Sequence, residues 1–357
     1  MGTRTPYHPW TMSFASHGGG GRRWASDDRG AVRSQLYEVS ITTTIQSSAL
    51  VKTRAAELGF IACGITTPDP VAHAGELDRW LAAGYGGNMR YLHRQAARRK
   101  EPQRIVPEAR SIVVVLDNYY TEGDQAPPRV ARYARGKDYH RVTGKRLEQL
   151  AEFLRSQGAT VARAYVDAGP VPERELAQRA GLGWIGKNTM LIRPGTGSFF
   201  FIGSVFTDLP LPPDLPFEAD RCGSCTRCLE ACPTEAFVGP RVLDATRCIS
   251  YLTIEYKGEP PPDLVPEFQG WAFGCDICND VCPWNQRFAE PTSVPEFAPM
   301  TTLPPDPGYF DRMTEAEFSA RYGDTPLERP GLAGMRRNIR VALPGTARTE
   351  DGGNVDA

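Results

Sequence analysis

The sequence predicts an α+β protein in which an α/β domain comes first, a cysteine-rich module follows, and a short helical segment comes last. Three observations lead to this prediction. Apolar stretches of helix and strand type alternate between residues 46 and 215. Eight of the nine cysteines then fall between Cys222 and Cys282. A proline-rich linker over residues 209–216 separates these two regions.

These shifts in composition predict four parts: a disordered leader over residues 1–45, the α/β domain over 46–215, the cysteine module over 216–290, and a helical segment with a disordered tail over 291–357. The leader is rich in Gly, Ser and Arg and shows no periodicity. No apolar stretch follows its Arg22–Arg23 pair, so no export signal is expected. A net charge of −1 excludes a polycation, and no apolar run is long enough to predict a membrane span.

Each element of the α/β domain is predicted from its periodicity and from the residues that end it. Gly59 and Gly84 end the first two helices. The continuous apolar run over residues 111–117 is typical of a strand that is buried on both faces. Cys63 lies in an apolar strand and is interpreted as a core residue. The expected helices cover residues 49–58, 76–83, 147–156 and 173–180, and the expected strands cover residues 60–66, 111–117, 159–166 and 198–208.

The cysteines carry the strongest signal. From Cys222 they follow the spacing C-x2-C-x2-C-x3-C-P of a bacterial-type double iron–sulfur site, in which the fourth cysteine ligates the other cluster. The second run, Gly274–Pro283, has Ala272 where a leading cysteine would stand, and Cys248 is the cysteine left to replace it. We therefore predict a ferredoxin-like module with two [4Fe–4S] clusters. Cys222, Cys225, Cys228 and Cys282 are expected to hold one cluster, and Cys232, Cys248, Cys275 and Cys278 the other.

Two other interpretations of the cysteines stay open. Eight thiolates could form two tetrahedral zinc sites. Zinc ribbons do not usually carry a C-x3-C-P tail on each run, however, and no histidine lies between residues 222 and 283. Disulfides are less favoured, because metal-ligand spacing in a chain without an export signal indicates a reduced compartment.

Two further features lie near the end of the α/β domain. Asp167 stands where a strand is expected to meet a helix, which is a common place for a catalytic group and for a helix cap. The stretch Gly181–Asn188 is similar to a dinucleotide fingerprint and to a phosphate-binding loop, but a helix precedes it where both motifs need a strand. Its glycines are instead expected to let the backbone pass close to a flat cofactor beside Trp184.

Two basic stretches are candidates for contact with nucleic-acid phosphates. Seven Arg or Lys residues and a single acid lie between Arg129 and Arg146, interleaved with Tyr133 and Tyr139. After the cysteine module, Thr314 and Glu317 predict a capped helix over residues 314–322, and a short basic helix is expected over residues 331–343, with Arg336, Arg337 and Arg340. The alternative for both stretches is a solvated helix face.

The chain resembles the epoxyqueuosine reductase family between residues 46 and 345. The motifs that carry the resemblance are Arg99–Pro102, Pro107–Ser111, Gly136–His140, Val166–Arg174, Gly183–Asn188, Cys222–Pro233, Arg247–Thr253 and Gly274–Pro283. His140 is not expected to ligate cobalt, because the glycine of a cobalt-binding D-x-H-x-x-G motif stands one residue late, at Gly144.

The resemblance implies a cobalamin enzyme with two [4Fe–4S] clusters, which reduces epoxyqueuosine to queuosine at the wobble position of tRNA. The family's proton donor falls on Asp167. The implied partners are tRNA and an external electron donor such as a flavodoxin or ferredoxin, with a monomer in the cytoplasm. Cobalamin contacts are expected at Arg99, Ala131, Asp167, Leu191, Ile202 and Tyr251, with Asn188 and Ser250 added as neighbours.

Many members of this family continue into a HEAT-like helical repeat that helps to hold tRNA, and most of that repeat is expected to be missing here. Other functions stay open: a cobalamin-dependent reductive dehalogenase-like oxidoreductase, a ferredoxin-like electron carrier, and a zinc-ribbon RNA-binding protein. An assay distinguishes the dehalogenase-like function from that of the epoxyqueuosine reductase family: it compares turnover of epoxyqueuosine tRNA with turnover of a chlorinated small molecule. Cobalt and iron contents separate the other two.

Overall fold

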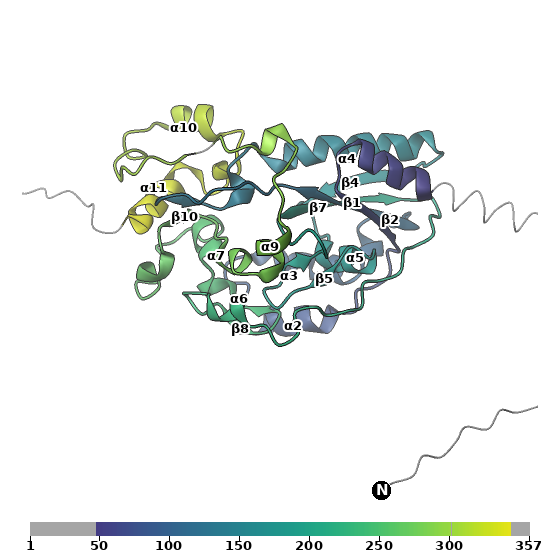
Figure 1. Cartoon of the computed structure of the whole chain (residues 1–357), viewed down its shortest axis with the longest axis horizontal. Helices are drawn as coiled ribbons and strands as arrows, with labels where there is room; N and C mark the ends of the chain where they lie inside the picture. Colours follow the sequence, from purple (N-terminus) through teal and green to yellow (C-terminus); the bar gives the residue numbers. More distant parts are fainter. Residues whose placement is uncertain (1–47, 301, 344–357) are drawn as a thin grey trace, which may run out of the picture. The chain divides into compact units, whose positions relative to one another are not determined.

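A four-stranded sheet forms the centre of the α/β domain (Figure 1). The structure is a computed structural model that describes residues 48–300 and 302–343; the expected leader and tail lie outside these residues. The strands are β1 (Ala62–Thr66), β2 (Ser111–Asn118), β4 (Ala162–Val166) and β7 (Phe200–Thr207), which confirms the four expected strands. They lie in the order β1-β2-β7-β4, and every neighbouring pair is antiparallel.

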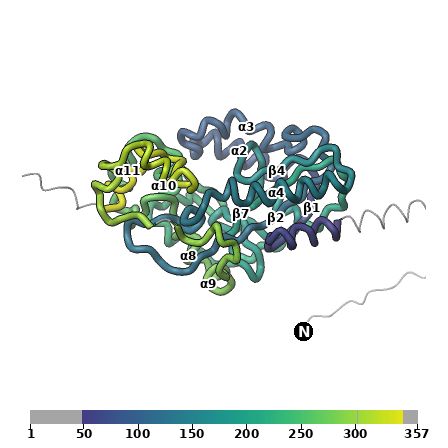
Figure 2. Tube along the Cα trace, turned by 90° about the horizontal axis from the view of Figure 1, so that it is seen from above, coloured from purple at the N-terminus to yellow at the C-terminus, as the bar shows by residue number. Residues whose placement is uncertain are grey.

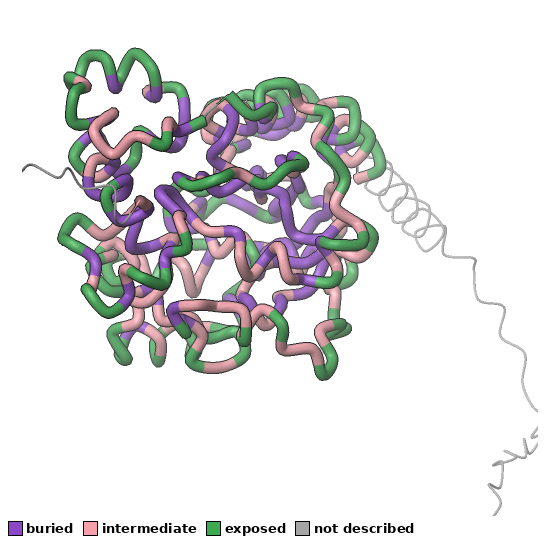
Figure 3. Tube along the Cα trace, turned by 60° about the vertical axis from the view of Figure 1, so that its left-hand side comes forward, coloured by how far each residue is buried: buried purple, intermediate pink, exposed green. Residues whose placement is uncertain are grey.

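Helices cover both faces of this sheet, which explains why β2 is apolar throughout. The face that carries Val113 packs against the helix over residues 48–57 and against α4 (Tyr139–Ser156). The opposite face, which carries Val114, packs against α5 (Glu173–Arg179). Figure 3 shows the buried residues gathered in the interior of the molecule. Since a fully buried Val or Ile side chain contributes about 1.5–3 kcal/mol, β2 is a major source of stability.

Two helices differ from the sequence prediction. Helix α4 begins at Tyr139, well before the expected residue 147, because Asp138 caps it by accepting a hydrogen bond from the backbone N–H of His140. Helix α3 (Arg90–Lys100) was not predicted at all. None of its residues is buried, so it has no apolar stripe for sequence periodicity to detect. It packs beside α2 (Ala74–Ala82), as Figure 2 shows.

The cysteine module consists of short elements. Its helices are α6 (Arg227–Glu230), α7 (Ile249–Ile254), α8 (Ile277–Asp280) and α9 (Pro283–Phe288). Three two-stranded ribbons accompany them: β5 (Trp184–Ile185) with β6 (Leu191–Ile192), β8 (Phe237–Gly239) with β9 (Val242–Leu243), and β10 (Trp271–Phe273) with β3 (Arg129–Val130). Turns of 3-10 helix lie at Pro102–Arg104, Arg132–Ala134, Ala245–Arg247, Val265–Phe268, Pro295–Phe297 and Pro326–Glu328. Since β3 precedes the module and β10 belongs to it, their pairing joins the module to the α/β domain.

The C-terminal segment packs onto this ribbon. Helices α10 (Glu315–Tyr322) and α11 (Gly331–Ala342) share a hydrophobic cluster with Val130 and Phe273. The expected capping box of Thr314 and Glu317 is present at the start of α10. The division into four parts stays a prediction. Across the described ranges, every helix is too short or too polar to span a lipid bilayer.

Candidate active site and cluster-binding module

Asp167 lies in the loop directly after β4, where the sequence predicted it. Its φ of 45° falls in the left-handed region, which Asp tolerates better than most residues. The backbone N–H of Asp167 donates to Glu173 Oε1 at 2.7 Å, and this bond holds the loop against the start of α5. The side chain of Asp167 is 63% exposed, so its carboxyl group is accessible to solvent or to a substrate.

Tyr139 holds the Asp167 carboxylate in place. The Tyr139 hydroxyl donates to Asp167 Oδ2, and its ring stacks on Phe201 with centroids 4.1 Å apart. Burial, and then the Asp167 charge, raise the pKa of Tyr139 well above its usual value, so the phenol keeps its proton and remains a donor. His140 Nε2 lies 3.9 Å from the same oxygen. Oδ1 has no hydrogen-bond partner among the residues that the structure describes, and is available to another group.

Glu173 is the second carboxyl group of this loop. Its own burial, and then the neighbouring Asp167 charge, raise its pKa to about 8. Glu173 therefore keeps its proton to higher pH than an ordinary glutamate, which reduces the charge repulsion between Glu173 and Asp167.

Arg99 connects the loop to α3. Its guanidinium donates to Gly169 O at 3.2 Å and to Val171 O at 3.5 Å, so α3 is fixed against the segment that follows Asp167. The buried Nε of Arg99 has no hydrogen-bond partner. A polar group of a bound cofactor would satisfy it.

Charged and phenolic groups from several elements surround Asp167. Each of them interacts electrostatically with the Asp167 carboxylate, and they come from α3, the 3-10 turn Arg132–Ala134, α4, α5 and the C-terminal segment. Sequence reasoning did not assign Tyr139, His140 or Glu173 to the site, although all three lie inside motifs that the resemblance uses. The groups are Tyr91, Arg99, Tyr133, Tyr139, His140, Glu173, Arg174 and Arg329.

The cysteines separate into two groups. A cavity of about 210 Å³ is lined by Cys222, Cys225, Cys228 and Cys282 together. In the second group, burial raises the pKa of the Cys278 thiol, and the nearby sulfurs of Cys275, Cys248 and Cys232 raise it further. Among the described residues, no three Cys, His, Asp or Glu side chains are grouped as around one metal ion.

The stretch Gly181–Asn188 contacts the first group of cysteines. The indole N–H of Trp184 donates to Cys222 Sγ at 3.4 Å, and Trp184 is only 1% exposed. Lys187 Nζ donates to the carbonyl oxygens of Gly223 and Cys225 at 2.8 and 2.9 Å. The expectation that these glycines make room for a flat cofactor is wrong at Gly183, because a Cβ there would lie 2.2 Å from Ile192 O in the partner strand.

The other residues expected to contact cobalamin are more scattered. Ile202 stands beside the end of β4, since its neighbour Gly203 pairs with Val166, which precedes Asp167. Tyr251 is buried, and its hydroxyl accepts a hydrogen bond from the backbone N–H of Asn88 at 2.7 Å, just before α3. Asn188 is buried against the carbonyl of Cys278. Ala131 and Leu191 are buried in hydrophobic clusters, and Ser250 is half-buried.

Several cations of the two predicted basic stretches are engaged by other groups of the protein. Arg132 is paired with Asp276 and Asp280, and Arg146 is paired with the fully buried Asp117. Four others, Arg129, Arg135, Arg336 and Arg337, donate to backbone carbonyl oxygens. Lys137 and Arg141 are exposed or half-buried and pair with Asp324, Arg340 lies near Glu259 and Asp311, and Lys145 is exposed. The prediction of phosphate contacts is therefore wrong for Arg132, Arg135, Arg146, Arg336 and Arg337.

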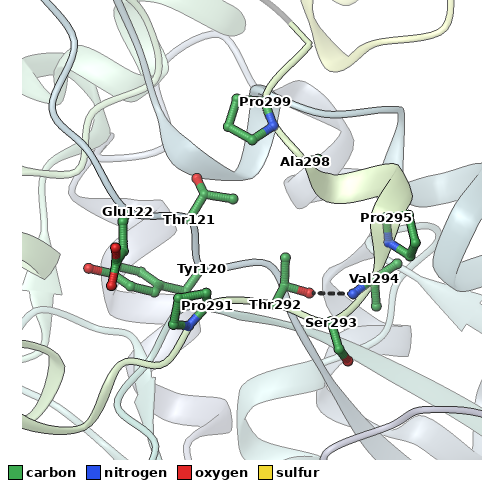
Figure 4. A pocket seen from close by; sticks show the side chains of 10 residues that line it. All are labelled: Tyr120, Thr121, Glu122, Pro291, Thr292, Ser293, Val294, Pro295, Ala298 and Pro299. Carbon is green, nitrogen blue, oxygen red and sulfur yellow. Dashed lines mark hydrogen bonds between the residues drawn. The ribbon is translucent and has the colours of Figure 1, made fainter.

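A second cavity, of about 320 Å³, lies between the segments 120–122 and 291–299 (Figure 4). Its wall is formed largely by prolines and small side chains, and the hydroxyl of Thr292 accepts from the backbone N–H of Val294 at 3.1 Å. None of the predicted site residues lines it, so this cavity is separate from the sites described above.

Two sequence models match the chain. One, described as a 4Fe-4S double cluster binding domain, matches residues 221–285. The other, described as epoxyqueuosine reductase QueG, DUF1730, matches residues 99–168. Together they include Asp167 and the eight cysteines of the module, which favours iron–sulfur clusters over zinc.

Known proteins are similar over most of the chain. Epoxyqueuosine reductase of Pseudomonas aeruginosa is 45% identical over 300 residues, which are 80% of this chain and 82% of that protein. A crystal structure of epoxyqueuosine reductase with an epoxyqueuosine-modified tyrosine tRNA stem loop is 31% identical, with a TM-score of 0.73, and the match covers 84% of this chain and 81% of that one.

A structure of the Bacillus subtilis enzyme, whose catalytic aspartate loop is swung out of the active site, is also 31% identical, with a TM-score of 0.73 and coverages of 84% and 82%. These matches span both the Asp167 loop and the cysteine module. The chain therefore belongs to the epoxyqueuosine reductase family of oxidoreductases, and its cysteine module is a double [4Fe–4S] cluster-binding domain.

Proposed function

We propose that this chain reduces epoxyqueuosine to queuosine at the wobble position of a tRNA anticodon, with Asp167 as the proton donor. The reaction takes two electrons and two protons: both C–O bonds of the epoxide break, a carbon–carbon double bond forms, and the oxygen leaves as water. Amino-acid side chains do not supply electrons of this kind, so bound cofactors must do so.

Two [4Fe–4S] clusters and a cobalamin supply the electrons when bound. We assign Cys222, Cys225, Cys228 and Cys282 to one cluster, because these four thiols line one cavity. Cys232, Cys248, Cys275 and Cys278 are assigned to the other, because they influence one another's pKa.

The residues around Asp167 fit a cobalamin in part. The unpartnered Nε of Arg99 offers a buried donor, and Ile202 lies beside the same loop. Tyr251 lies just before α3, where its hydroxyl is bonded to Asn88. The remaining expected contacts to cobalamin would come from the surrounding backbone and packed side chains, at Ala131, Asn188, Leu191 and Ser250.

The hydrogen bonding and the exposure of the Asp167 carboxyl group are the observation that carries the proposal. Tyr139 binds Oδ2, while Oδ1 has no hydrogen-bond partner among the described residues, so the exposed Asp167 carboxyl group can take a proton from solvent and pass it to the departing oxygen. Glu173 accepts a hydrogen bond from the backbone N–H of Asp167, and its burial and then the Asp167 charge raise the pKa of Glu173. The catalytic aspartate loop of the Bacillus subtilis relative also supports an aspartate in this role.

The proposed partner is the anticodon stem-loop of tRNA, since a solved relative holds such a stem loop. A base must be turned out of its stack before side chains can reach it, and a base at the wobble position lies in a loop that allows this. We further propose an external flavodoxin or ferredoxin as electron donor, and a monomer that works in the cytoplasm.

Anaerobic turnover tests the proposal. Protein reconstituted with iron, sulfide and cobalamin, and reduced chemically, is given tRNA that carries epoxyqueuosine, and the loss of one oxygen is followed by mass spectrometry. We expect conversion of this tRNA and none of a chlorinated phenol under the same conditions. Conversion of the phenol alone, or of neither compound by protein that holds all its cofactors, contradicts the proposal.

A further inference from the structure

One face of α3 carries three exposed arginines whose side chains have no hydrogen-bond or ion-pair partner in the part of the chain that the structure describes. Arg90, Arg94 and Arg98 are spaced by four residues, so they lie on one side of the helix, and all three are exposed. Among the described residues, none of them forms an ion pair. The nearby carboxylates are already paired: Glu101 with Arg104 at 2.5 Å, Asp78 with Lys100 at 2.9 Å, and Glu76 with Arg79 at 2.9 Å.

This arrangement does not stabilise the helix by itself. Like charges four residues apart on a helix repel each other and destabilise it. The arginines of the predicted basic stretches behave differently, since Arg132 and Arg337 are buried and fully engaged with oxygen atoms of the protein. The α3 arginines thus keep their donors for a ligand outside the protein.

The opposite side of α3 is fixed to the site. Arg99 lies about 180° around the helix from Arg90, and its guanidinium binds the carbonyls of Gly169 and Val171 in the Asp167 loop. Figure 2 shows α3 along the outer edge of the molecule in that view. A ligand bound along Arg90–Arg98, a length of about 12 Å, would therefore lie in a defined position relative to Asp167.

We propose that Arg90, Arg94 and Arg98 form a ridge, the α3 arginine ridge, that binds backbone phosphates of the tRNA stem-loop. Guanidinium groups match phosphate geometry with paired N–H donors and stay charged at every physiological pH. Several of them in a row favour a polyanion over a single small anion, because each contact releases counterions. The inference rests on the proposed function for the identity of the RNA, and it names the surface that presents this RNA to Asp167.

A matched pair of double variants tests the ridge. Arg90→Gln/Arg94→Gln removes two charges from it, and Arg110→Gln/Arg163→Gln removes two exposed charges elsewhere. Binding of a fluorescent anticodon stem-loop RNA to the reconstituted holoenzyme is measured by anisotropy over a salt series. For the ridge variant we expect Kd to rise about tenfold or more, as for lost charge-assisted hydrogen bonds. The slope of log K against log salt should shrink by roughly 1–2.

Turnover separates this inference from the proposed function. With epoxyqueuosine stem-loop as substrate, the ridge variant should show a raised KM and an unchanged kcat, with unchanged iron content. An unchanged Kd and salt slope, or an equal loss in the control variant, overturns the ridge while the wild-type turnover still stands. If the wild type binds RNA through the ridge but never converts epoxyqueuosine, the ridge stands and the proposed function fails.

Discussion

The two ends of the site differ in their exposure to water. The Asp167 side chain is 63% exposed and surrounded by titratable groups. Of the module's cysteines, Cys282 is buried and the other seven are half-buried, and Trp184, which contacts Cys222, is 1% exposed. A proton donor must be reloaded from solvent, so it benefits from access. A cluster must keep its potential and its ligands, and both depend on exclusion of water and on hydrogen bonds to sulfur.

A short piece of chain connects these two ends. The Asp167 loop leads into α5, and α5 leads to Trp184 and Asn188, which contact Cys222 and the carbonyl of Cys278. One continuous segment, residues 166–188, therefore positions both the proposed proton donor, Asp167, and the residues that contact the cluster cysteines. Variants of the Asp167 loop and of the cysteine module can therefore be compared, to find whether a change in one region affects the other.

The largest effect is expected at the cysteines. Cys248→Ala should lose one of the two clusters, so that iron falls from eight to about four atoms per chain and turnover disappears. Cys63→Ala is the matched control, because burial raises the pKa of the Cys63 thiol to about 12 and keeps it an inert core residue. Iron analysis and electron paramagnetic resonance measure the outcome. Eight irons in Cys248→Ala would show that the assigned ligand set is wrong.

Asp167→Asn should affect proton donation and leave the clusters unchanged. Removal of a positioned acid lowers kcat by roughly 10²–10⁴-fold, while iron content and cluster spectra stay as in the wild type. Asp263→Asn, at another exposed aspartate, serves as the control for a surface charge change. Single-turnover kinetics with epoxyqueuosine tRNA measure the effect. A wild-type rate in Asp167→Asn would remove this residue from the reaction.

Glu173→Gln should change how stability depends on pH. The folded-state pKa of Glu173 is raised to about 8, above its ordinary value of 4.5, so the folded protein binds more protons than the unfolded chain between these limits. The wild type therefore loses stability as pH rises through this window. The glutamine variant cannot ionise and lacks this loss. In thermal unfolding at a fixed scan rate, the Tm of the variant should rise relative to that of the wild type from pH 5 to pH 8. A difference in Tm that does not change with pH would argue against a protonated Glu173.

The smallest effect is expected from Trp184→Phe, which changes a residue that contacts the cysteine module. The indole N–H stabilises the more negative, reduced cluster, so its loss should lower the midpoint potential. A contribution of about 1 kcal/mol corresponds to roughly 40 mV for one electron. The second cluster serves as an internal reference, and Trp284→Phe, which changes the ring packed edge-on at 5.0 Å, controls for packing. A redox titration that shows no shift, or a positive one, would contradict the prediction.

Local patterns were sufficient for much of the fold. The apolar run of β2, the capping box at Thr314 and the place of Asp167 after β4 depend on residues close in sequence, and all three were predicted correctly. Helix α3 was missed because its contacts with the rest of the protein are polar, made by side chains such as Arg99, and leave no apolar period.

The cysteine spacing and the Asp167 motif were determined by the sequence, because ligand runs and strand ends are read from neighbouring residues. Only the tertiary structure decided which arginines are available to a ligand. The carboxylates that engage Arg132 stand 144 and 148 residues away, and the donors of Arg337 end on carbonyls about 80 residues earlier in the chain. A charge is free or bound according to what folding brings beside it, and no local pattern contains that information.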